Sequence, residues 1–126
     1  MAYITSDNGI KCHWNFKLLP SGFLAITLFG HVFFNKPKSY VERYLKTLDG
    51  KYTMNHEYIH VLQANSFKTK YLGFYLYYIW YWFIGLFKYG VKKYASYKNI
   101  PFEREAFRNA TNLNYKETKW RDYIEK

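Results

Sequence analysis

Residues 55–63 read NHEYIHVLQ, and both the fold and the chemistry of the chain can be argued from this stretch. His56 and His60 are four positions apart, so on a helix with about 3.6 residues per turn they lie about 40° apart around the axis. Both imidazoles can therefore reach one metal ion, and catalytic zinc takes three protein ligands and keeps one position open. Glu57 can hold a zinc-bound water and take its proton. We predict a helix here, with His56 and His60 as metal ligands and Glu57 as the catalytic base.

Gln63 continues the same helical face by another turn. It either orients a ligand or lines a cleft, or it is a solvated polar residue, and the sequence leaves these alternatives open. The competing interpretation of the whole motif is an amphipathic helix with two incidental histidines. A chain of this size matches the pattern by chance about once in a few hundred cases, so the motif favours a metal site and still needs a third ligand.

Candidates for the third ligand lie in residues 102–107, which read FEREAF. Glu103 and Glu105 would be about 200° apart on a helix, so only one of them can face the metal. The other interpretation of Glu105 is a surface ion pair with a neighbouring arginine or lysine, which contributes little stability. His31 lies in an apolar stretch, where it is an alternative ligand or a histidine of the core or the sheet edge.

The expected fold class is α+β and mainly helical, in a single domain over residues 1–126. Residues 23–34 read FLAITLFGHVFF, which indicates a small sheet or hairpin near the N-terminus, broken near Gly30. Trp120 and Tyr123 are expected to dock on the body. The helices are expected from Ser39 to Asp49-Gly50, from Thr53 or Asn55 to Ser66 (the HExxH helix), from Thr69 to Tyr94 (a long aromatic helix), and from Asn99-Ile100-Pro101 to Asn112 (a glutamate helix).

The aromatic segment 71–87 reads YLGFYLYYIWYWFIGLF and carries no charge. As a helix it spans about 25 Å, less than the hydrocarbon core of about 30 Å. One apolar stripe and one aromatic stripe recur at helical spacing. If one stripe packs on the catalytic helix, the other can rest on a bilayer surface, helped by flanking lysines. The alternatives are a wholly buried helix and, in third place, a transmembrane span. The stripes are Leu72, Leu76, Ile79, Phe83 and Leu86, and Tyr75, Tyr78 and Trp82.

Charge and composition restrict the partners and the location. The net charge is +10, which favours anionic partners. No nucleic acid is expected, because the aromatic residues cluster in an uncharged run and are not interleaved with basic ones. Cys12 is the single cysteine, so no intrachain disulfide can form. Without a secretory signal pattern at the N-terminus, the expected location is cytoplasmic; the membrane-surface alternative places the protein peripheral on, or anchored to, the inner membrane.

A resemblance to known families narrows the choice of the third ligand. A His-Glu-x-x-His helix followed by a glutamate helix resembles the gluzincin class of metallopeptidases, and Glu103-x-x-Ala106 is similar to the Glu-x-x-Ala-Asp motif of CAAX-prenyl-protease-type membrane zinc proteases. The resemblance implies Glu103 as the third zinc ligand. The aspartate of that motif, which orients a zinc-binding histidine, falls on Phe107 here. The segments GFLAITLFG, NHEYIHVLQ and IPFEREAF together resemble a small bacterial family of uncharacterised metallopeptidases.

The motif and the resemblance predict a zinc-dependent metallopeptidase that hydrolyses peptide bonds through a zinc-bound water activated by Glu57. A peptide or protein substrate would add as a further strand at the edge of residues 23–34. The alternative function is a zinc-binding, non-catalytic protein that interacts with a membrane surface.

Overall fold

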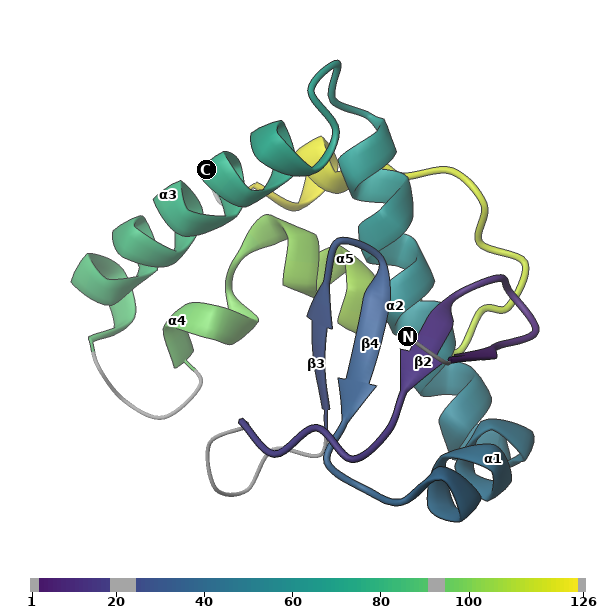
Figure 1. Ribbon diagram of the computed structural model, residues 1–126. Helices are drawn as coiled ribbons and strands as arrows, with labels where there is room; N and C mark the ends of the chain where they lie inside the picture. The colour runs from purple at the N-terminus through teal and green to yellow at the C-terminus, as the bar shows by residue number, and fades with distance from the viewer. Residues whose placement is uncertain (1–2, 19–24, 91–94, 125–126) are drawn as a thin grey trace. The chain divides into compact units, whose positions relative to one another are not determined.

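The computed structural model describes residues 3–18, 25–90 and 95–124 (Figure 1). It is α+β and mainly helical, with a small sheet near the N-terminus, and this confirms the predicted fold class. Contacts divide the chain into two compact units, Met1–Tyr58 and Ile59–Lys126. The boundary falls inside one continuous helix.

The first unit contains a four-stranded sheet with the order β1-β2-β4-β3. β2 and β4 are parallel, and the other neighbours are antiparallel. The β3–β4 turn is formed by Phe29 and Gly30, both with positive φ, as a two-residue hairpin turn requires. The predicted break near Gly30 is therefore confirmed, whereas residues 23–24 of the predicted strand lie outside the described residues. The strands are β1 (Ile4–Thr5), β2 (Lys11–His13), β3 (Ala25–Leu28) and β4 (His31–Phe34).

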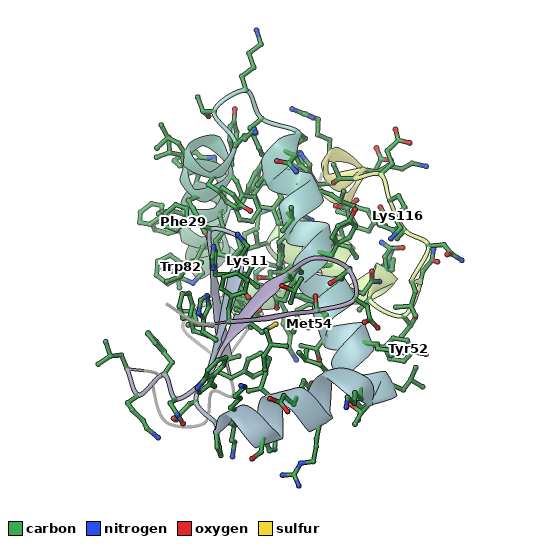
Figure 2. The ribbon with its side chains drawn as sticks, turned by 45° about the vertical axis from the view of Figure 1, so that its right-hand side comes forward. Lys11, Phe29, Tyr52, Met54, Trp82 and Lys116 are labelled. Carbon is green, nitrogen blue, oxygen red and sulfur yellow. The ribbon has the colours of Figure 1, made fainter. Side chains whose placement is uncertain are left out.

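The core of the first unit follows from the alternation of side chains along its strands. Val32 and Phe34 of β4 are buried, while the intervening residues are partly exposed. Cys12 of β2 is fully buried; burial first, and then the Glu57 carboxylate, raises the pKa of its thiol to about 11. Its Sγ lies 3.6 Å from Sδ of Met54, whose side chain lies beside β2 in Figure 2. The core residues are Ile10, Cys12, Val32, Phe34, Val41 and Met54.

Two helices meet at Thr47, whereas the sequence led us to expect the first helix to continue to Asp49-Gly50 and the second to begin at Thr53 or Asn55. α1 (Lys38–Lys46) ends before it, and α2 (Leu48–Asn65) begins after it. Thr47 Oγ1 accepts a hydrogen bond of 2.9 Å from the N–H of Gly50, so Thr47 caps the N-terminus of α2. The predicted helix end at Asp49-Gly50 and the predicted caps Thr53 and Asn55 are therefore wrong. All of these residues belong to α2.

Gly50 permits the close contact between the two helices. A Cβ atom built on it would lie 1.9 Å from the backbone oxygen of Tyr44 and 2.7 Å from its carbonyl carbon. We expect Gly50→Ala to lower the free energy of unfolding by about 1–3 kcal/mol, because backbone atoms must shift to make room. Urea unfolding followed by circular dichroism measures this. Lys51→Ala, at an exposed position of the same turn, should change stability by less than about 0.5 kcal/mol. Equal stability of Gly50→Ala and the wild type would contradict the prediction.

The second unit is helical, and its core is mainly aromatic. Trp120 is 3% exposed and stacks on Phe67 with ring centroids 5.6 Å apart, which confirms that the tail docks. α5 begins at Pro101, as predicted, and ends three residues before Asn112. The elements after α2 are α3 (Tyr71–Tyr89), α4 (Ala95–Lys98), α5 (Pro101–Asn109) and the 3-10 helix η1 (Trp120–Tyr123); the core residues are Ala64, Phe74, Ile100, Phe102 and Trp120.

The long aromatic helix α3 has one face in the core and one exposed face. Phe74 is 4% exposed, and its ring centroid lies 5.9 Å from that of His60 on α2. Leu72, Leu76 and Ile79 of the predicted apolar stripe are each about 60% exposed, so the helix is not wholly buried. Among the described helices, none is both long and apolar enough to cross a membrane. The predicted extension to Tyr94 covers residues 91–94, which lie outside the described residues.

Candidate metal centre

The structure brings together three residues predicted as metal ligands. His56 and His60 come from α2, and Glu103 comes from the first turn of α5. Each offers one ligand atom, these atoms lie within 4.8 Å of one another, and all three side chains are buried. Two imidazole nitrogens and one carboxylate oxygen are a donor set that suits zinc and leaves a fourth position open. This buried group could therefore hold a metal ion.

Helix α2 itself fixes the spacing of His56, Glu57 and His60, because it continues through all of them without a break. Glu57 is half-buried, and its Oε2 accepts a hydrogen bond of 2.6 Å from Oγ1 of Thr27 on β3. The alternation along β3 exposes Ile26 and turns Thr27 to the more buried side. One oxygen of the predicted base is thus held by a side chain of the sheet.

Glu103 is held through both of its carboxylate oxygens. Its Oε1 lies 3.0 Å from Nε2 of His60, and its Oε2 accepts a hydrogen bond of 2.6 Å from the hydroxyl of Tyr78 on α3. Tyr78 belongs to the aromatic stripe of α3, and no role at the site was predicted for it. The sequence did contain an indication of this contact, because a tyrosine on the packed side of a helix needs a hydrogen-bond partner for its hydroxyl.

Gln63 and Glu105 lie behind His60. Gln63 is fully buried, and its Oε1 lies 2.8 Å from Nδ1 of His60, the ring nitrogen opposite the one that faces Glu103. Its Nε2 donates to the backbone oxygen of Phe102 at 2.9 Å and to Oε1 of Glu105 at 2.8 Å. The solvated alternative for Gln63 is therefore wrong, because the side chain makes hydrogen bonds inside the protein.

Glu105 is fully buried and accepts hydrogen bonds from the residues that follow α5. The hydroxyls of Tyr115 and Thr118 donate to it at 2.6 Å, and the backbone N–H of Lys119 donates to it at 2.5 Å. Burial first, and then the bond to Glu105, raises the pKa of Tyr115. The expectation of a surface ion pair fails because Glu105 is buried among neutral donors.

The remaining candidate, His31, lies on β4 in the first unit. Its Nδ1 is 2.9 Å from Nε2 of His13, and the two rings stack with centroids 5.1 Å apart. His31 is not part of the His56–His60–Glu103 group. Phe107, at the position of the family aspartate, is 51% exposed, so it contributes nothing to the orientation of a buried ligand.

The second unit also contains an open cavity of about 680 Å³ that involves none of the predicted site residues. It lies on the side of α5 that carries Arg104 and Arg108. Nη2 of Arg104 donates to Oδ1 of Asn99 at 2.7 Å, so this guanidinium is anchored locally. The cavity is thus separate from the His56–His60–Glu103 group. It is lined by Lys98, Asn99, Arg104, Phe107, Arg108, Asp122, Tyr123 and Ile124.

Comparison with known proteins adds no assignment, since no family model, no curated protein and no solved structure matches the chain. The resemblance to gluzincin-like metallopeptidases thus stays a prediction from the motifs.

Proposed function

We propose that this protein is a zinc-dependent metallopeptidase that hydrolyses peptide bonds in a peptide or protein substrate. The observation that carries the proposal is the buried group of His56, His60 and Glu103, with Glu57 next to the first ligand on the same helix. A buried cluster of this composition is expensive unless its polar atoms are satisfied, which is why such clusters favour a functional interpretation.

Each residue of the candidate site has a role in the proposed reaction. His56, His60 and Glu103 would hold the zinc, which when bound supplies Lewis acidity and lowers the pKa of water. Glu57 would take the proton from the attacking water and pass it to the leaving amine. Thr27 holds Oε2 of Glu57, so the other carboxylate oxygen can serve as the proton acceptor.

The edge of β3 is the proposed binding site of the substrate. Within the described residues β3 pairs with β4 alone, and it carries Thr27, the residue bonded to the proposed base. An extended peptide can add to such an edge through backbone hydrogen bonds. The scissile bond would then lie close to Glu57.

The first test is the metal content of the purified protein by mass spectrometry. We expect about one zinc per chain in the wild type and little zinc in His56→Ala, His60→Ala and Glu103→Ala, because a catalytic zinc needs its three protein ligands. Glu42→Ala, at an exposed position of α1, should retain the metal. Circular dichroism shows whether each variant folds. No bound zinc after reconstitution, or full zinc in Glu103→Ala, would contradict the proposal.

The exposed face of α3 favours a second candidate function, interaction with a membrane surface, with or without catalysis. Six large apolar side chains fall within about 100° of the helix circumference. Lys68, Lys70 and Lys88 are exposed near the two helix ends, and the net charge is +10. An apolar stripe flanked by lysines suits the surface of an anionic bilayer and would place the protein at the inner membrane. The six residues are Leu72, Leu76, Ile79, Trp80, Phe83 and Phe87.

Vesicle sedimentation tests this candidate. We expect binding to vesicles containing phosphatidylglycerol, weak binding to neutral vesicles, and loss of binding in Leu76→Glu/Phe83→Glu. Leu48→Glu/Leu113→Glu places the same two charges at positions that are 58% and 43% exposed outside the stripe, so it should reduce binding far less. Equal loss in both variants, or a stripe variant that only converts an oligomer to a monomer, would rule out the bilayer as the occupant.

A further inference from the structure

We infer that Gln63 is a positioning residue, which holds a proton on Nδ1 of His60 and thereby presents Nε2 of that ring to the metal. The inference rests on the proposed function and deepens it. The two ring nitrogens of a histidine differ, and the partner of one decides which nitrogen is available as a ligand.

The amide of Gln63 can have only one orientation. Its two nearest partners other than His60 are the backbone oxygen of Phe102, at 2.9 Å, and Oε1 of Glu105, at 2.8 Å. A carbonyl oxygen can only accept, so the NH₂ group of Gln63 must face this pair. The amide oxygen therefore faces Nδ1 of His60 at 2.8 Å. Because an amide oxygen cannot donate, Nδ1 must carry the proton.

Glu105 keeps this orientation in place. It is fully buried and accepts bonds from three donors in residues 115–119 as well as from Gln63. Four donors fill the acceptor positions of one carboxylate, so no hydroxyl proton of its own is available to face Gln63. A flipped amide would direct its oxygen at two acceptors and lose both bonds.

Gln63, on α2, thus orients the histidine ligand. The family motif assigns this role to an aspartate at the position that Phe107 occupies here. Phe107 is 51% exposed, whereas Gln63 is fully buried beside the ligand. The support of His60 by a neutral amide adds no negative charge behind the ligand. The carboxylate of Glu105 is one hydrogen bond further from the ring, on the other side of the Gln63 amide.

A direct test is the nitrogen NMR spectrum of the ¹⁵N-labelled full chain loaded with zinc. Long-range ¹H–¹⁵N correlations should show a proton on Nδ1 of His60 that exchanges slowly with water, and metal attached at Nε2. Metal attached at Nδ1 would overturn the inference and leave the metal site intact. A chain that binds no zinc at all would instead overturn the proposed function, and the inference with it.

Zinc affinity, measured by competition with a chelator, tests the same point through variants. Gln63→Glu keeps the acceptor for His60 but sets a second carboxylate against Glu105, so its zinc affinity should fall by about 10- to 100-fold. Gln63→Glu/Glu105→Gln moves the amide to the other partner and keeps the acceptor for His60, so it should retain the slow Nδ1 proton and recover part of that loss; the recovery is partial because the new carboxylate still faces the backbone oxygen of Phe102. Recovery without that proton, or no recovery in a folded double variant, would contradict the role of Gln63.

Discussion

Glu105→Leu is expected to lower the free energy of unfolding by about 4 kcal/mol or more, a large part of the stability of a small domain. The substitution fills the same fully buried position with an apolar side chain of similar size but leaves four donors without their acceptor. Each buried donor without a partner costs about 1–3 kcal/mol, and small domains have only about 5–15 kcal/mol in total. Thermal and urea unfolding of the metal-free chain measure the loss.

Glu117→Leu is the matched control for this prediction. Glu117 lies in the same segment between Tyr115 and Lys119, but it is exposed. We expect its effect on stability to stay within about 0.5 kcal/mol. Similar losses in the two variants would show that Glu105 does not hold this segment.

Glu57→Gln is expected to reduce peptidase turnover by about 10²- to 10⁴-fold while the zinc content stays near one per chain. Glutamine has nearly the same shape and can still accept a bond from Thr27, but it cannot take a proton. A mixture of peptides, with products followed by mass spectrometry, serves as the substrate. Thr27→Val should produce a smaller loss, because it removes one hydrogen bond to the base and leaves the carboxylate.

Zinc content separates the two explanations of an inactive variant. If Glu57→Gln loses its metal, the role of Glu57 is to maintain the structure of the metal site and not to accept the proton of the attacking water. If the wild type binds zinc and cleaves nothing, the non-catalytic alternative at a membrane surface becomes the better description.

Sequence periodicity predicted the elements whose signals are local. Residues 23–34 gave a β-branched and aromatic run with one glycine, and the hairpin follows it. Pro101 marked the start of α5, because a proline fits the first turn of a helix. The junction at Thr47 was missed because the cap depends on Gly50 tolerating the carbonyl of Tyr44, which is a contact between helices.

The part of the candidate site that lies on one helix was predictable from the sequence. His56, Glu57 and His60 follow from spacing alone, but the choice between Glu103 and Glu105 rested on a resemblance. Two glutamates two positions apart face different sides, and only the fold shows which side meets His60. Tyr78 was missed as a partner of Glu103 because it is 25 residues away in the chain.

Three of the four donors that hydrogen-bond to Glu105 come from residues 115–119, so they are synthesised after the helix that carries His56 and His60. The chain leaves the ribosome from its N-terminus, and early segments begin to fold first. The helix with His56 and His60 emerges well before Tyr115, Thr118 and Lys119, which complete the support behind Gln63. A nascent chain that ends before Lys119 therefore has the candidate ligands but not their final scaffold. If the group holds a metal as proposed, stable loading would accordingly be a late event in biosynthesis.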